Sequence, residues 1–165
     1  MEDDILNSIM RVSRIYIDTS VIGGCFDPEF AKWSNGLMKD FRLGHFKAIV
    51  SNLVTVELIK APEQVRKKYA ELIESGVEVI EENEKVERLV EVYSKRKILG
   101  DKFKNDLTHI ALATVFDVDL VVSWNFKHIV NFDKIRQFNA VNKELGYKLI
   151  QILSPREVTN YEEEI

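Results

Sequence analysis

Short β-branched and aromatic runs alternate with helical patterns along this chain, and that alternation limits its fold more than any other feature. Strands are predicted at residues 14–18, 47–51, 77–81, 119–123 and 149–153. Several of these runs are apolar on both faces, which is typical of strands in a parallel sheet covered by helices on each side. We therefore expect an α/β fold, a three-layer α/β/α sandwich around a central, mostly parallel sheet of four to five strands.

The segments between these strands carry apolar residues at spacings of three and four, the period of an amphipathic helix. The clearest pattern joins Phe30, Trp33, Leu37 and Phe41, and its apolar face is a candidate contact for a partner or a second copy. Helices are predicted at residues 29–43, 53–60, 63–74, 84–99, 105–116 and 132–145, with a short one opened by Pro155.

The chain length of 165 residues suits one domain with one sizeable core. We expect residues 14–165 to form that single domain and residues 1–13 to be an N-terminal extension. No apolar run approaches the roughly 20 residues of a membrane helix, and the acidic start is unlike a secretory signal. The single cysteine, Cys25, forms no internal disulfide. A cytoplasmic protein without membrane contact is expected.

The formal net charge of −4 argues against nucleic-acid binding if charge alone decides. Acids gathered in one cleft to hold a cation would lower that total while leaving the outer surface basic. Basic clusters occur at residues 66–68, at residues 95–97, and at Lys102 with Lys104. Solvated helix faces produce the same pattern, so both interpretations stay open.

Three acids are candidates for a site, and the first lies where a doubly wound sheet places one, beyond the carboxyl end of a strand. Asp18 ends the first strand, Glu57 lies in the least polar stretch around any glutamate, and Asp106 opens a buried helix. A shielded carboxylate needs a cation or a hydrogen-bond network. Each acid also has an ordinary explanation: a cap of the turn at residues 19–20, an exposed polar stripe, and a favourable helix macrodipole, respectively.

Four other polar residues accompany these acids. Ser20 follows Asp18 closely, and Asn125 and His128 come just past the fourth strand. His109 lies three residues after Asp106 on the same helix face, where it either positions a phosphate or hydrogen-bonds that acid.

Two further pairs of residues near the fourth strand are assigned away from the site. Trp124 and Phe126 are expected in the core rather than as stacking surfaces for bases. Asp117 and Asp119 precede the strand, at the opposite end of the sheet, and are left out.

The order of these segments resembles the PIN-domain family, in particular the VapC-like toxins of prokaryotic toxin–antitoxin pairs. Residues 16–22 are similar to the family's first acidic motif, residues 55–58 to the segment with its second acid, and residues 105–113 to the segment with its third. Residues 121–129 fall where the family commonly has a fourth acid after a strand. The resemblance spans about residues 14–153.

This resemblance implies a metal-dependent endoribonuclease that hydrolyses RNA phosphodiesters, the toxin of a type II toxin–antitoxin pair. The expected partners are an RNA substrate, a cognate antitoxin and a second copy in a homodimer. Oxygen ligands and the lack of thiolates favour Mg²⁺ or Mn²⁺ over zinc. The implied metal ligands are Asp18, Glu57 and Asp106; Asn125 joins them as a catalytic residue, and Ser20, His109 and His128 are auxiliary.

Asn125 departs from the family pattern because it brings no charge where an Asp is common. The alternative is therefore a non-catalytic PIN-like module that binds RNA or a protein. A magnesium-dependent phosphotransfer enzyme is a third interpretation. It is disfavoured because the segment from Asp18 to Ser20 lacks the second acid that haloacid-dehalogenase phosphatases carry two positions later.

Overall fold

The computed structural model describes residue 2 and residues 11–159. Its strands are β1 (Ser13–Ile17), β2 (Phe46–Ser51), β3 (Glu78–Ile80), β4 (Leu120–Val122) and β5 (Ile152–Leu153). They form a sheet of order β3-β2-β1-β4-β5 in which every neighbouring pair is parallel. The α/β class and the parallel sheet are confirmed. Most of the predicted extension at residues 1–13, and residues 160–165 of the predicted domain, lie outside the described residues.

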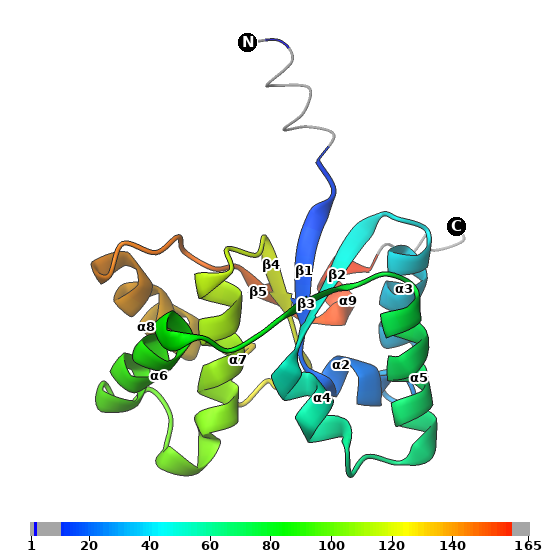
Figure 1. Ribbon diagram of the computed structural model, residues 1–165, viewed down its shortest axis with the longest axis horizontal. Helices are drawn as coiled ribbons and strands as arrows, with labels where there is room; N and C mark the ends of the chain where they lie inside the picture. The colour runs from blue at the N-terminus through cyan, green and yellow to red at the C-terminus, as the bar shows by residue number, and fades with distance from the viewer. Residues whose placement is uncertain (1, 3–10, 160–165) are drawn as a thin grey trace.

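Helices cover both faces of the sheet. They are α2 (Thr19–Gly24), α3 (Ala31–Arg42), α4 (Asn52–Leu58), α5 (Glu63–Glu74), α6 (Glu84–Lys95), α7 (Lys104–Val115), α8 (Phe132–Glu144) and α9 (Pro155–Val158), with a 3₁₀ turn η1 at Asp101–Phe103. Figure 1 shows α6, α7 and α8 on one side and α2, α3, α4 and α5 on the other. Within the described residues, no helix is long and apolar enough to cross a membrane.

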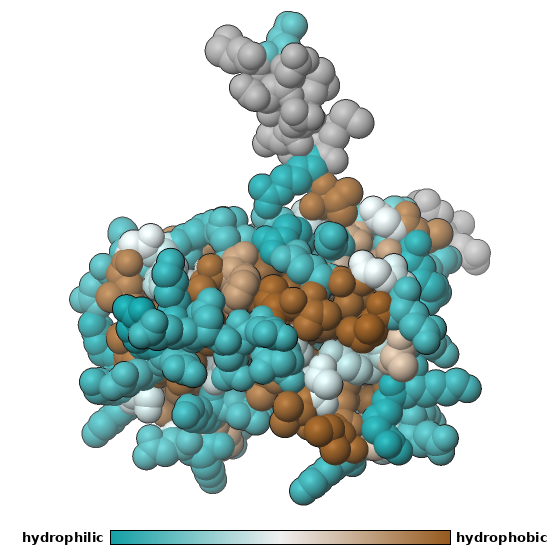
Figure 2. Space-filling view, in the orientation of Figure 1, coloured by the Kyte–Doolittle hydropathy of each residue, from teal (hydrophilic) through white to brown (hydrophobic). Residues whose placement is uncertain are grey.

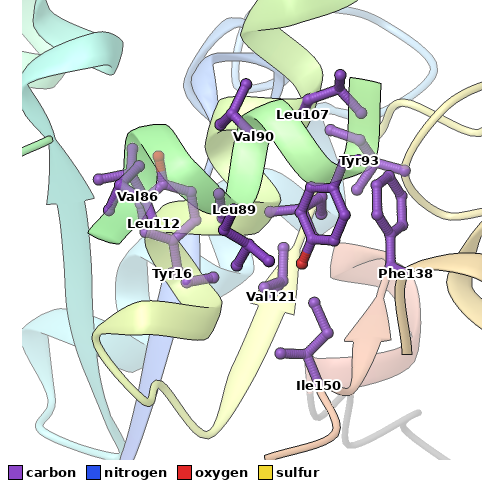
Figure 3. Packing of buried hydrophobic residues seen from close by; sticks show 14 of the residues in the cluster. Tyr16, Val86, Leu89, Val90, Tyr93, Leu107, Leu112, Val121, Phe138 and Ile150 are labelled. Carbon is purple, nitrogen blue, oxygen red and sulfur yellow. The ribbon is translucent and has the colours of Figure 1, made fainter. Parts of the chain in front are cut away.

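Alternate side chains of β1 supply the two cores, because successive residues of a strand point to opposite faces. Ile15 and Ile17 pack in one buried cluster, and Tyr16 packs in the other with α6, α7 and α8. Figure 3 shows this second cluster, in which Tyr16 lies near Leu112. Val79 of the edge strand β3 is 48% exposed. Figure 2, in the orientation of Figure 1, shows an apolar band across the middle of the molecule.

Helix α2 is the main element that local sequence patterns do not predict. A turn is predicted at residues 19–20, where the structure begins a helix of six residues. Two of those six residues are glycines, which have low helix propensity, so local preference does not show the helix. Burial of Val21 and Ile22 stabilises it instead. Gly24 allows its close packing, since a Cβ there would lie 2.7 Å from Trp124 Nε1.

The apolar face of α3 is not the exposed contact surface that the periodicity suggested. Leu37 is fully buried, and Phe30, Trp33 and Phe41 pack partly buried against the cluster on that side of the sheet. The stripe is less exposed than the periodicity suggested because it packs against its own domain, and its role as a partner contact stays a prediction.

Strand order reverses between β1 and β4, since the chain winds from β1 outward to β3 and then returns to the other side of β1. In open α/β sheets the ligand crevice forms beyond the carboxyl ends of the strands at this switch point. Asp18 directly follows β1 and Ser123 directly follows β4. The topology therefore places both residues at the switch point of the sheet.

Candidate active site

Asp18 is a buried carboxylate held by two hydroxyl groups. Its exposed fraction is 5%. Ser20 Oγ donates to Oδ1 at 2.5 Å, and Ser123 Oγ donates to Oδ2 at 2.7 Å. Each hydroxyl also accepts a backbone N–H at 2.9 Å, from Trp124 to Ser20 and from Asn125 to Ser123. The accepted bonds direct both hydroxyl protons at Asp18 and fix the orientation of its carboxyl group.

Burial raises the pKa of Asp18 above its usual value. The charge of His109 and the hydrogen bonds from Ser20 and Ser123 oppose that rise, while the nearby Glu57 charge adds to it. Ionising this carboxyl is therefore costly in the protein by itself. A bound cation would offset that cost.

Glu57 and His109 form the most closely bonded pair of the site. His109 Nε2 lies 2.6 Å from Glu57 Oε1, and Thr19 Oγ1 donates to the same oxygen at 2.9 Å. On its other side, His109 Nδ1 lies 2.6 Å from the Tyr16 hydroxyl, which also lies 2.8 Å from Ser51 Oγ. The His109 side chain is 2% exposed and that of Glu57 is 26% exposed.

The electrostatics keep Glu57 ionised. Burial raises its pKa, but the hydrogen bond and charge of His109, with hydrogen bonds from Thr19 and Asn105, outweigh burial and bring the pKa below its usual value. Burial raises the pKa of Tyr16 well above its usual value, so the phenol keeps its proton. A carboxylate only accepts hydrogen bonds, so His109 Nε2 donates to Glu57, while the donor between His109 Nδ1 and the Tyr16 hydroxyl depends on the protonation of the ring.

Asp106 and His128 form a second, more exposed pair. His128 Nδ1 lies 2.8 Å from Asp106 Oδ2, with side-chain exposures of 11% and 21%. The backbone N–H of His128 donates to Asn125 Oδ1 at 3.0 Å. Because the Asn125 N–H is bonded to Ser123, hydrogen bonds connect Asp106 to Asp18 across the ends of β4 and β1.

The structure brings all the predicted site residues to one edge of the sheet but changes their pairing. His109 bonds to Glu57, not to Asp106 as its position three residues away suggests; His128 takes that role. Asn125 uses its amide oxygen in a local turn. Within residues 11–159, no three histidine, cysteine or acidic side chains are arranged as a preformed metal site.

Among the participants that the sequence-based set of site residues lacks, Tyr16 and Ser123 bond directly to His109 and Asp18. Ser123 had a detectable signal, since it ends β4 as Asp18 ends β1. Tyr16 had none, because a tyrosine within an apolar strand is indistinguishable from an ordinary core residue.

The two aromatic residues after β4 differ in burial. Trp124 is buried as expected and its ring stacks on Phe30 at 4.1 Å, but Phe126 is 50% exposed. The prediction that Phe126 is a core residue is therefore wrong. Both rings lie in the segment that supplies backbone N–H groups to the site.

Comparisons with known proteins identify the fold. No family model matches this sequence, and no curated protein matches it. Two solved structures are similar over most of the chain. One is VapBC2 from Rickettsia felis, bound to a DNA fragment from its promoter, with a TM-score of 0.55, 14% identity, and coverage of 86% of this chain and 98% of that chain.

The second similar structure is VapBC-1 from nontypeable Haemophilus influenzae. Its TM-score is 0.56 at 16% identity, and the match covers 87% of this chain and 98% of that chain. The chain thus has the PIN-domain fold of VapC-like proteins.

Proposed function

We propose that this chain is a divalent-metal-dependent endoribonuclease that hydrolyses RNA phosphodiester bonds, and that it is the toxin of a type II toxin–antitoxin pair. One observation carries the proposal. Asp18 and Glu57 are close enough to interact electrostatically, and a chain of hydrogen bonds through His128, Asn125 and Ser123 links Asp106 to Asp18. In the described part of the chain, none of the three acids forms an ion pair with a lysine or arginine.

The donor chemistry of these residues fits Mg²⁺ or Mn²⁺, since carboxylate oxygens are the ligands that both ions prefer. A histidine nitrogen now lies on one oxygen of Glu57 and on one oxygen of Asp106. Asp18, Glu57 and Asp106 would hold the ion. When bound, it would lower the pKa of a water molecule and relieve negative charge on the phosphate.

The contribution of the chain itself is orientation. Ser20 and Ser123 fix both oxygens of Asp18, so little side-chain entropy is lost when this carboxylate binds a cation. His109 positions Glu57 and favours its charged form, and the Tyr16 hydroxyl fixes the imidazole through its other ring nitrogen, Nδ1. His128 positions Asp106 in the same way at the rim.

An antitoxin belongs to the proposal because both similar structures are VapBC proteins. Val56 and Ile59 of this chain flank Glu57 and are 59% and 65% exposed. Exposed apolar side chains beside a candidate site suit a covering protein segment. A homodimer and a cytoplasmic location remain predictions.

A cleavage assay on labelled single-stranded RNA tests the proposal. Wild type should cleave in Mn²⁺ or Mg²⁺ and not in EDTA. Asp18→Asn should cleave at least about a thousandfold more slowly, equivalent to roughly 4 kcal/mol of barrier. The control is Asp119→Asn, an acid at the other end of the sheet, which should cleave as wild type does. Equal cleavage by all three proteins would identify a contaminant and reject the site.

Binding of RNA without cleavage in every metal would instead support the non-catalytic PIN-like module. The lack of a preformed metal cluster among the described residues favours that second candidate.

A further inference from the structure

A cavity of about 310 Å³ opens beside the Asp106–His128 pair. Its lining includes Lys97, Lys127 and Lys134, with Phe103 and His128. His128 therefore belongs both to the candidate active site and to the wall of this cavity. Figure 1 shows the chain between α6 and α7 at the same end of the molecule as the step from β1 into α2.

The charge of this cavity is opposite to that of the chain. Three lysines and no acid line it among the described residues, whereas the formal net charge is −4. A larger groove of about 680 Å³ lies between α6 and α7, and acidic residues outnumber basic ones in its lining: Glu82, Glu87, Glu91 and Asp101 against Lys95 and Lys104. A polyanion near this edge is attracted to the smaller cavity and repelled by the groove.

Specific contacts hold the residues that line this cavity in place. Lys134 Nζ donates to the Ile98 carbonyl at 2.8 Å and so joins α8 to the loop after α6. The Phe103 ring packs 4.0 Å from the His128 ring. Lys97 and Lys127 carry exposed side chains at the mouth.

Lys97 adopts a backbone conformation that disfavours lysine. Its φ is +55°, in the left-handed region, directly after the C-cap residue of α6. Glycine is the usual residue at such helix ends, and a residue with a Cβ costs about 1 kcal/mol or more there. An unfavourable residue at an exposed position beside a site suggests that its side chain is used.

We propose that this cavity is a phosphate subsite that receives the RNA phosphate next to the one being hydrolysed, with Lys97 and Lys127 as its contacts. The proposal rests on the proposed ribonuclease function of the neighbouring acids, since His128 both lines this cavity and hydrogen-bonds to Asp106. Phosphate is favoured over a carboxylate ligand because the strand that reaches Asp106 carries a phosphate at every nucleotide.

Salt-dependent binding of a short single-stranded RNA, measured by fluorescence anisotropy in EDTA so that the RNA stays intact, tests the subsite. The Lys97→Gly/Lys127→Gln double variant should bind about tenfold more weakly, and its slope of log K against log salt should be shallower by about 0.7 for each lysine. Lys85→Gln, an exposed lysine in the first turn of α6, is the matched control and should behave as wild type.

Lys97→Gly also reports on folding. Glycine suits φ +55°, so this variant should melt at or above the wild-type temperature while it loses the charge. Unchanged affinity and slope in the double variant, or no RNA binding by wild type, would overturn the subsite. If wild type cleaves RNA and the double variant binds normally, the subsite alone fails. If the double variant loses binding but wild type never cleaves, the nuclease proposal alone fails.

Discussion

Asp119 and Asp18, at opposite ends of the sheet, are held in opposite ways. At the amino end, Asp119 forms an ion pair with Arg11 and accepts the Arg14 backbone N–H at 2.8 Å, and Glu78 pairs with Arg14 at 2.7 Å. Burial raises the pKa of Asp119, but these partners outweigh it and bring the pKa below its usual value. At the carboxyl end, Asp18 has only hydroxyl donors and its pKa is raised.

This difference separates acids that are neutralised by arginine from Asp18, which is not. An acid that pairs with arginine inside the chain is already neutralised and needs nothing from solution. An acid that is buried with hydroxyl groups is oriented but not neutralised, so the folded protein favours any cation that reaches it. Fold position and charge pairing together therefore support the carboxyl end as the place of the proposed metal site.

The largest effect on the free energy of unfolding should come from removing the histidine that pairs with an acid at the carboxyl end, and removing the one at the amino end should have a much smaller effect. His109 is 2% exposed and bonded on both ring nitrogens, so His109→Ala should cost roughly 2–4 kcal/mol by leaving Tyr16 and Glu57 without that partner. The His45 side chain is 58% exposed and pairs with Asp40 near the start of β2. His45→Ala should therefore lower the free energy of unfolding by less than about 1 kcal/mol. Urea denaturation measures both, and equal costs would contradict the contrast.

Metal binding should give the next effect. Divalent ions at about a hundred times their Kd stabilise a folded state by roughly 2.7 kcal/mol, which in a domain of this size raises Tm by about 5–10 °C. Thermal melts in MgCl₂ or MnCl₂, against NaCl of equal ionic strength, should show this rise in wild type and in Asp119→Asn. Asp18→Asn should lose it. A rise that persists in Asp18→Asn would place the ion elsewhere.

The smallest effect should be the pH dependence of the metal-free protein. The folded pKa of Asp119 is lowered, so its stabilisation is present above the unfolded pKa near 3.8 and is lost as pH falls through the folded pKa. The folded pKa of Asp18 is raised, so its ionisation destabilises the protein increasingly as pH rises above 3.8.

Denaturation in EDTA between pH 4 and pH 8 measures these opposite signs. At pH 7, Asp119→Asn should be less stable than wild type and Asp18→Asn more stable, each by about 1 kcal/mol or less. The Asp18→Asn difference should shrink toward pH 4, whereas the Asp119→Asn difference should persist to pH 4 and be lost only below the unfolded pKa near 3.8. A loss of stability in Asp18→Asn at pH 7 would mean that its hydroxyl bonds outweigh its burial.

Local sequence patterns predict the elements that carry strong periodicity. The helix predicted at residues 63–74 is α5 with the same bounds, and the strand predicted at residues 47–51 differs from β2 by one residue at its start. Such elements follow from side-chain spacing alone. Helix α2 follows from burial against a distant part of the chain, and no local pattern contains that information.

By itself, the sequence determined the α/β class and the parallel strands, because residue spacing is a local property. It also singled out Asp18, Glu57 and Asp106 as candidate acids, and their role stays a prediction. Only the tertiary structure decided which histidine holds which acid, that Ser123 orients Asp18, and that Lys97 and Lys127 share a cavity with His128. These pairings join residues far apart along the chain. Their geometry depends on how helices pack across the sheet, which residue spacing does not specify.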